Sequence, residues 1–336
     1  MSALLDVENL HIAFDTSRGQ LQVVNDINFS IQAGEIFGLV GESGCGKSVT
    51  CLSILRLIPK PGGITQGRIL FQGEDLLKKS SREMRRIRGN DIAMIFQDPF
   101  TSLNPVFKIG QQLFNVVRQH STRNKTQARQ HILSVLDNVG LPDVERVYNS
   151  YPHELSGGQQ QRVMIAMALI SEPQLIIADE PTTALDVTIQ AQILRLLRAL
   201  CDEHGISVLL ITHDLGVVSE VCDRSAVLYA GKVVEAAATD ELLAHPTHPY
   251  TQGLLAALPI SSKKGSPLQA ITGTVPANPG AIQGCVFASR CPHVFDACHE
   301  KHPPQFTVSD NHNAACFLLD DRIAKDNQPE AGSTYE

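Results

Sequence analysis

The feature that most constrains this chain is a glycine-rich segment between an apolar run and a helical pattern. Residues 36–40 read IFGLV, which is typical of a buried strand. The spaced motif Gly41-x-x-x-x-Gly46-Lys47-Ser48 follows at once, and a helix-like stretch comes next. Glycines let the backbone wrap around an anion with its N–H groups pointing inward, and the positive end of the helix adds a favourable field. The order of strand, loop and helix therefore predicts a phosphate-binding loop in an α/β fold.

The side chains of this loop indicate a nucleotide ligand with a magnesium ion. We expect Lys47 to reach the β- and γ-phosphates and the Ser48 hydroxyl to bind Mg²⁺. Cys45 is either a small filler of the loop or an oxidisable thiol whose pKa the inward N–H groups lower. The expected nucleotide-binding positions are Gly41, Glu42, Ser43, Gly44, Cys45, Gly46, Lys47, Ser48 and Val49.

Two later apolar runs end in polar side chains. Residues 175–178 precede Asp179 and Glu180, and the run SVLLIT ends at His213. Open α/β sheets bind ligands at the carboxyl ends of their strands, so these side chains are expected near the loop. We expect Asp179 to hold Mg²⁺, Glu180 to act as general base on the attacking water, and His213 to hydrogen-bond the γ-phosphate. The alternatives are an acidic turn after a core strand and a structural histidine.

The segment LSGGQ predicts a second anion-binding surface. Ser156 stands at a helix N-cap position, two glycines follow it, and apolar residues recur at helical spacing over 163–170. Free N–H groups at a positive helix end favour phosphate. One chain has no obvious use for two such surfaces on one nucleotide, whereas two chains arranged head to tail would use both. Each chain would then cap its partner's nucleotide with Ser156, Gly157, Gly158 and Gln159.

Together these motifs resemble those of the nucleotide-binding subunits of ABC transporters. GESGCGKS, LSGGQ, LIIADEP, the ALD at Ala184 to Asp186 and His213 stand in that family's order and at its spacings, from about residue 4 to residue 235. The resemblance implies a P-loop NTPase (RecA-like) α/β core with an antiparallel β part. It also implies a helical subdomain at about 99–166, within a nucleotide-binding domain over residues 1–240.

The same resemblance assigns three further residues. Gln97 in MIFQDP would contact Mg²⁺ and the attacking water, and its loop would touch a membrane subunit. Phe14 would stack on adenine, unless it is a strand residue that faces the core. Asp186 would help to join the two halves of the dimer.

Charge and hydropathy limit the other classes of protein. The net charge of −7 argues against a nucleic-acid partner, and the 107 residues between Ser48 and Ser156 contain no sustained heptad repeat. A DNA-acting ABC ATPase is therefore a remote alternative. No stretch approaches about 18 consecutive apolar residues, and the N-terminus lacks a signal-peptide pattern. We expect a peripheral subunit on the cytoplasmic face of the inner membrane.

The C-terminal part resembles one branch of the ABC family. The segment HPYTQ, His248 to Gln252, is similar to the extension of oligopeptide and dipeptide importer ATPases, and the ATP motifs are closest to their D-type subunit. The resemblance implies ATP hydrolysis that powers the uptake of di- or oligopeptides. The implied partners are a homologous F-type ATPase subunit, two transmembrane permease subunits and an extracytoplasmic solute-binding protein. Nickel, glutathione or another small solute remains an alternative, because related ATPases are very similar.

Four of the eight cysteines lie in the extension, which is expected over 241–321. Cys285, Cys291, Cys298 and Cys316 are spaced x5, x6 and x17 in an irregular region rich in Pro and Gly. A cytosolic compartment disfavours disulfides, and structural zinc usually pairs its cysteines at about x2 to x4. The longer spacing suits a [4Fe–4S] cluster, which some D-type subunits hold in a tail of this kind. Zinc and unligated thiols remain alternatives, and a redox-regulated iron–sulfur ATPase is a remote one.

The remaining cysteines and the nearby histidines are expected to have simpler roles. Cys51, Cys201 and Cys222 are interpreted as small buried hydrophobic side chains. The polar residues 322–336 are expected to be disordered. If the metal is zinc, His293 or His299 would be a ligand. Otherwise the histidines of this region are expected to be exposed spectators: His293, His299, His302 and His312.

Overall fold

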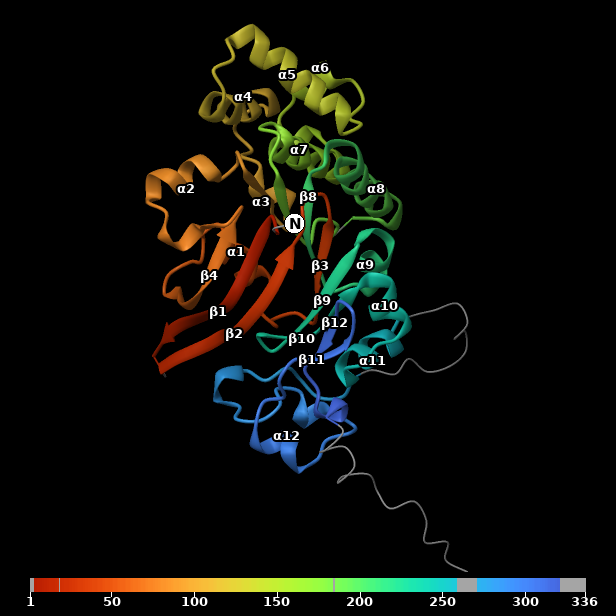
Figure 1. The fold of residues 1–336 in the computed structure, drawn as a ribbon. Coiled ribbons are helices and arrows are strands. Elements are labelled where there is room, and N and C mark those ends of the chain that lie inside the picture. The colour runs from red at the N-terminus through yellow and green to blue at the C-terminus, as the bar shows by residue number, and fades with distance from the viewer. Residues whose placement is uncertain (1–2, 18, 184, 259–270, 321–336) are drawn as a thin grey trace, which may run out of the picture.

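The computed structural model describes residues 3–17, 19–183, 185–258 and 271–320, so the tail expected over 322–336 lies outside it. Two β-sheets and the helices around them make up the described chain (Figure 1). The strands of the smaller sheet are β1 (Leu5–Thr16), β2 (Gly19–Ile31), β4 (Gly62–Phe71) and β5 (Glu74–Asp75). They pair antiparallel in the order β2-β1-β4-β5, which provides the expected antiparallel part.

The larger sheet has eight strands. They are β3 (Ile36–Val40), β6 (Ile92–Ile95), β7 (Leu175–Asp179), β8 (Ser207–Thr212), β9 (Arg224–Tyr229), β10 (Lys232–Ala238), β11 (Phe306–Ser309) and β12 (His312–Ala314). Their order is β11-β12-β10-β9-β3-β8-β7-β6. The five strands from β9 to β6 pair in parallel, whereas β10, β12 and β11 pair antiparallel.

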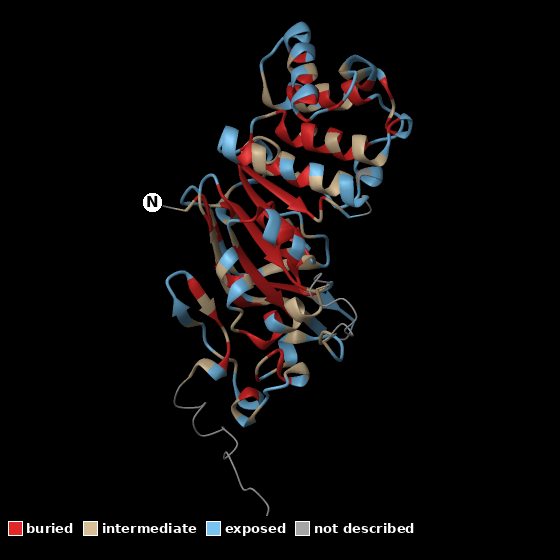
Figure 2. Cartoon of the chain, turned by 90° about the vertical axis from the view of Figure 1, so that its right-hand side faces the viewer, coloured by how far each residue is buried: buried red, intermediate tan, exposed pale blue. Residues whose placement is uncertain are grey.

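Both faces of the parallel strands are buried, which explains the continuous apolar runs in the sequence. Ile36 and Val40 of β3 pack into one hydrophobic core, while Phe37 and Leu39 pack into the other. The first core contains side chains of the helical region, and the second contains side chains of the antiparallel sheet. Figure 2 shows buried residues along the strands and on the inward sides of the helices.

The helices fall into two groups. Around the sheets lie α1 (Lys47–Ile54), α2 (Ser81–Ile87), α8 (Val187–His204), α9 (Leu215–Val221), α10 (Thr239–Ala244), α11 (Pro249–Ala256) and α12 (Asp296–Glu300). The helical region consists of α3 (Pro99–Ser102), α4 (Ile109–His120), α5 (Lys125–Asn138), α6 (Val144–Asn149) and α7 (Gly157–Leu169). In Figure 1, α4 to α7 gather at one end of the molecule and α12 lies at the opposite end.

The C-terminal extension joins the central sheet. Its hairpin β11–β12 pairs with β10 through Glu235–Ala314 and Ala236–Asn313. The remaining described part of the extension consists of α11, short 3₁₀ turns and α12. The region expected to be irregular is thus tied to the core by strand pairing, which its Pro- and Gly-rich sequence did not indicate.

A buried polar cluster fastens the extension to the core. Glu235 of β10 is fully buried and accepts hydrogen bonds from the backbone N–H groups of Thr247 (2.6 Å) and His248 (3.0 Å). The Nε2 atom of His312 lies 2.8 Å from the same carboxylate, and His312 is also fully buried. The prediction that His312 is an exposed spectator is therefore wrong, because it is the partner of a buried carboxylate. His302 is half-buried, whereas His293 and His299 are exposed as expected.

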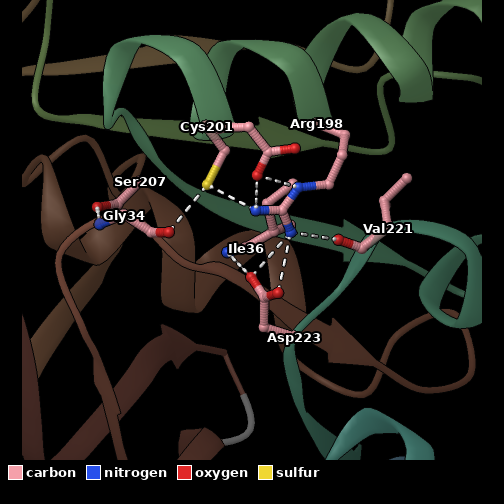
Figure 3. Close-up of polar contacts among 8 residues, drawn as sticks. Gly34, Ile36, Arg198, Cys201, Ser207, Val221 and Asp223 are labelled. Carbon is pink, nitrogen blue, oxygen red and sulfur yellow. Dashed lines mark hydrogen bonds and ion pairs between the residues drawn. The ribbon is translucent and has the colours of Figure 1, made fainter.

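A second polar network positions the start of β3 (Figure 3). Arg198 of α8 donates to both carboxylate oxygens of Asp223 at 2.9 and 3.0 Å, and Asp223 accepts from the N–H of Ile36 at 2.8 Å. The thiol of Cys201 donates to the carbonyl oxygen of Gly34 at 3.0 Å. Cys201 is therefore a buried residue, as predicted, and in addition a hydrogen-bond donor.

Candidate nucleotide-binding site

The glycines of the predicted loop are needed by the backbone. A Cβ atom on Gly41 would lie 2.1 Å from the carbonyl oxygen of Leu228, so the loop can pass β9 only with glycine at this position. Gly46 has a φ angle of +108° and forms the N-cap of α1. Side chains rarely tolerate this φ, whereas glycine does so readily. The loop therefore joins β3 directly to the N-terminus of α1, the arrangement predicted from the sequence.

Lys47 and Cys45 lie close together in this loop, with the Lys47 Nζ atom 3.8 Å from the Cys45 Sγ atom. The ammonium group of Lys47 donates to the carbonyl oxygens of Gly41 (2.7 Å) and Glu42 (3.0 Å) and so lies across the loop. Cys45 is 1% exposed and packs into the core. Burial raises the pKa of Cys45, and this effect outweighs the nearby Lys47 ammonium. The possibility of an oxidisable thiol with a lowered pKa is thus contradicted.

Ser48 and Asp179 come together from α1 and the end of β7. The Ser48 hydroxyl donates to a carboxylate oxygen of Asp179 at 3.0 Å. Burial raises the pKa of Asp179, while the hydrogen bond from Ser48 acts in the opposite direction. A hydroxyl beside a carboxylate supplies the oxygen ligands that Mg²⁺ prefers, and the charge of the ion would stabilise the ionised carboxylate.

The Glu180 carboxylate contacts the other predicted polar residues, Gln97 and His213. Its carboxylate accepts from the Gln97 amide at 2.9 Å and from the Thr183 hydroxyl at 3.0 Å. The Nδ1 atom of His213 lies 3.1 Å from its second oxygen. Burial raises the pKa of Glu180, but hydrogen bonds from His213 and Thr183 outweigh it and leave the pKa below its usual value. Glu180 is therefore a base that is ionised at neutral pH.

Most of these groups line one cleft, whereas Asp179 is not among its lining residues. Phe14, on β1, is half-buried and lines this cleft while its ring packs against Gly62, so it faces both the cleft and the antiparallel sheet. Leu254 of α11 also lines it. The cleft is lined by Phe14, Val23, Glu42, Ser43, Gly44, Gly46, Lys47, Ser48, Val49, Gln97, Glu180, His213 and Leu254.

The LSGGQ segment lies outside this cleft. Ser156 is the N-cap of α7, and its hydroxyl accepts from the N–H of Gln159 while the Gln159 side chain accepts from the N–H of Ser156. Neither Ser156 nor its glycines are among the residues that line the cleft. Asp186 is the N-cap of α8 and accepts from the N–H of Ile189 at 2.9 Å. Ala184 lies outside the described residues.

Two contacts of the loop were not predicted from the sequence. The N–H of Glu42 donates to the hydroxyl of Tyr250 at 3.0 Å, and the Glu42 carboxylate is paired with Arg290. Tyr250 belongs to HPYTQ and Arg290 stands beside Cys291. Neither residue lies in a local pattern that points to the loop, so no signal in the sequence could have placed them there.

The four cysteines of the extension line one small cavity. Burial raises the pKa of Cys285 to about 11 and that of Cys316 to about 12, and it also raises the pKa of Cys291. Among the described residues, however, no group of three or more His, Cys, Asp or Glu side chains could hold a metal ion. The cavity is lined by Cys285, Cys291, Cys298 and Cys316 together with His248, Phe287, His293 and other residues of the extension.

A glycine-rich loop in a cleft at the end of a parallel sheet, together with a capped, glycine-rich helix start outside that cleft, is the arrangement expected from the resemblance to ATP-binding cassette ATPases. Residues 24–183 match the family described as ABC transporter, and residues 234–298 match the C-terminal region of oligopeptide/dipeptide transporters. No helix in the described ranges has the length and apolar character required to cross a membrane.

Similar proteins agree with this class. The chain is 49% identical to the dipeptide transport ATP-binding protein DppD of Bacillus subtilis (strain 168), over 96% of each chain. It is 47% identical to the oligopeptide transport ATP-binding protein OppD of the same strain, over 98% of this chain and 93% of OppD. A solved dimeric structure of MJ0796, a bacterial ABC transporter cassette, matches with a TM-score of 0.63 and 28% identity, covering 70% of this chain and 98% of MJ0796. The chain therefore belongs to the ATP-binding proteins of ABC transporters, in the oligopeptide/dipeptide branch, and it is an ATPase.

Proposed function

We propose that this chain hydrolyses ATP to power the uptake of dipeptides or oligopeptides through separate membrane permease subunits. One observation carries the proposal: the ATP cleft and the oligopeptide/dipeptide C-terminal region occur in one chain that matches DppD and OppD over almost its full length. Nickel and glutathione, the alternative solutes, have no such support.

The cleft suggests a role for each polar residue. Ser48 and Asp179 bind Mg²⁺, and Lys47 binds the β- and γ-phosphates. Glu180 accepts a proton from the attacking water, because its carboxylate is ionised and faces the cleft. Three further residues complete the site: Gln97 orients the water and Mg²⁺, His213 contacts the γ-phosphate, and Phe14 stacks on adenine.

The proposal includes a head-to-tail dimer with a homologous F-type subunit. Ser156, Gly157, Gly158 and Gln159 of one chain complete the ATP site of the other, and Asp186 lies at the junction. The dimer is supported by the position of α7 outside the cleft, since one chain has no obvious use for two anion-binding surfaces on one nucleotide. The solved MJ0796 cassette is dimeric.

The permease subunits dock beside Gln97, on the cytoplasmic face of the inner membrane. Four exposed apolar side chains lie close to Gln97 in the sequence, within residues 96–107: Phe96, Phe100, Val106 and Phe107. Exposed apolar groups of this kind mark protein interfaces. A groove beside them, between β6 and the helical region, is lined by Met94, Phe96, Leu103, Val116 and Met167 among others.

The proposal divides the chain into a nucleotide-binding domain (1–240, with the helical subdomain at about 99–166) and an extension (241–321) that holds a [4Fe–4S] cluster through its four cysteines. Support comes from the four thiols, which all line one cavity. Burial raises the pKa of these cysteines, so the thiols need a nearby positive charge to ionise, and bound iron would supply it.

Anaerobically purified protein should contain about four irons and matching acid-labile sulfide per chain. One zinc, or neither metal, would contradict the cluster.

Uptake of a radiolabelled tripeptide by a strain that lacks this gene tests the transport function. The wild-type gene should restore uptake, and Lys47→Ala should leave it at background, because the variant cannot hold the phosphates. Restored uptake of nickel or glutathione without peptide uptake would overturn the peptide assignment. Uptake by Lys47→Ala at the wild-type rate would overturn the dependence on this ATP site.

A further inference from the structure

A carboxylate on the phosphate-binding loop is paired with an arginine of the C-terminal extension. The Nη1 and Nη2 atoms of Arg290 lie 2.6 and 3.0 Å from the two carboxylate oxygens of Glu42. This is a bidentate pair, the strongest form of the arginine–carboxylate contact. Glu42 also lines the nucleotide cleft, and its side chain is 31% exposed. Arg290 comes from a part of the chain 248 residues away.

The surroundings of Arg290 fix its guanidinium group in this position. Its side chain is 3% exposed. Nε donates to the carbonyl oxygen of Thr272 at 2.9 Å, Nη2 donates to that of Ile271 at 3.3 Å, and the group lies 5.6 Å from the centre of the Tyr229 ring. These contacts hold the guanidinium group in place, so it has little freedom to pair with another carboxylate. It is therefore preorganised to neutralise Glu42.

A carboxylate in this place creates an electrostatic problem for the loop. ATP carries several negative charges, and like charges near a partly buried site repel each other strongly. Uncompensated, the Glu42 carboxylate would weaken the binding of every phosphate group that the loop holds. We propose that Arg290 is a positioning residue of the ATP site. It neutralises Glu42 and holds its carboxylate, so that the loop can bind the triphosphate. The inference rests on the proposed ATP site and adds the extension to it.

Binding of the fluorescent analogue MANT-ATP to the purified full-length chain tests this role. Arg290→Met keeps the length of the side chain and removes its charge, and it should weaken binding about tenfold, a change of about 1.4 kcal/mol. Glu42→Gln together with Arg290→Met should restore the affinity to within about threefold of wild type, because the unpaired charge is gone. The penalty of Arg290→Met should also shrink as the KCl concentration rises, since salt screens repulsion. A purely structural role would show neither the rescue nor the salt dependence.

Arg224 offers a matched control. It forms an ion pair with Glu35 at 3.1 Å and lies 5.4 Å from the centre of the Phe37 ring. Arg224→Met therefore removes an ion pair and a cation–π contact, as Arg290→Met does. Glu35 precedes β3, at the end of the strand opposite to the loop. Arg224→Met should leave MANT-ATP affinity within about twofold of wild type, because no charge is released near the phosphates.

The outcomes separate this inference from the proposed function. If wild type binds MANT-ATP, Lys47→Ala does not, and Arg290→Met equals wild type, the inference alone fails. It also fails if the double variant binds as weakly as Arg290→Met. If wild type itself does not bind, the proposed function fails. Should Arg290→Met not fold by circular dichroism, Glu42→Gln decides: it should bind at least as tightly as wild type, and a loss beyond about threefold would overturn the inference.

Discussion

At the scale of single residues, Glu180 shows how the backbone aims the carboxylate that we propose as the general base. Its φ angle of +46° lies in the left-handed region, and its N–H donates to the carbonyl oxygen of Ile211 at 2.9 Å. The chain therefore turns sharply where β7 ends. This turn directs the carboxylate towards Gln97 and His213. A base in this position is within reach of a water molecule held by the same polar groups.

Glu180→Gln should abolish hydrolysis without abolishing ATP binding. The amide keeps the shape of the side chain but cannot accept the proton, so ATP hydrolysis should fall by a factor of about 10² to 10⁴. MANT-ATP affinity should stay close to that of wild type, and in a mixture with the F-type subunit ATP should trap a dimer that elutes early in size-exclusion chromatography. Glu172→Gln is the matched control, because Glu172 is exposed and also has a positive φ angle of 54°. Turnover by Glu180→Gln at the wild-type rate would show that another group is the base.

The residues of the ATP cleft differ in how far the sequence could predict them. Lys47 and Ser48 follow from a contiguous motif whose geometry is nearly fixed, and Asp179 and Glu180 follow from the end of a buried strand. Arg290 could not be predicted, because a residue so distant in sequence meets the loop only through the packing of the extension. The same holds for His312, whose polar character suggested exposure until strand pairing placed it beside Glu235.

At the scale of elements, β10 links the ATPase core to the extension. It pairs with β9 on one side and with β12 on the other. Glu235 lies in the middle of β10 and is fully buried. A buried carboxylate is tolerated only with good partners, and here the segment before α11 and the start of β12 provide them. The cluster therefore fixes two parts of the extension to one strand.

Glu235→Ala should destabilise the fold much more than a change at a neighbouring glutamate. It would leave the N–H groups of Thr247 and His248, and the buried His312 ring, without their acceptor, which should lower the free energy of unfolding by about 3 kcal/mol or more. Glu241 also lies near His312, at 3.7 Å, but is 41% exposed. Glu241→Ala should cost less than about 1 kcal/mol. Urea unfolding followed by circular dichroism gives both values, and equal effects would refute the anchoring role of Glu235.

At the scale of the whole molecule, the phosphate-binding loop and the LSGGQ helix start, proposed as a second anion-binding surface, are separate. The loop and α1 lie at the central sheet, whereas Ser156 and α7 belong to the helical region. Both have free N–H groups at a helix start, and the Ser156 capping box fixes the local geometry of the second one. Under the proposed function, a single chain thus contains two halves of different sites. Association with a second chain would complete them, and ATP would then act as the link between subunits.

Ser156→Arg should separate ATP binding from dimer formation. The long cationic side chain removes the N-cap and blocks the helix start, but it lies outside the cleft, so the isolated chain should bind MANT-ATP within about threefold of wild type. In the Glu180→Gln background, Ser156→Arg should prevent the ATP-induced dimer, because the partner's nucleotide loses its cap.

Ser80→Arg is the matched control, since Ser80 forms the same capping box at α2. Size-exclusion chromatography with ATP and the F-type subunit should give a dimer for Glu180→Gln and for Glu180→Gln with Ser80→Arg, and separate monomers for Glu180→Gln with Ser156→Arg. A dimer in the last case, or loss of MANT-ATP binding as severe as in Lys47→Ala, would mean that Ser156 does not serve the site of a second chain.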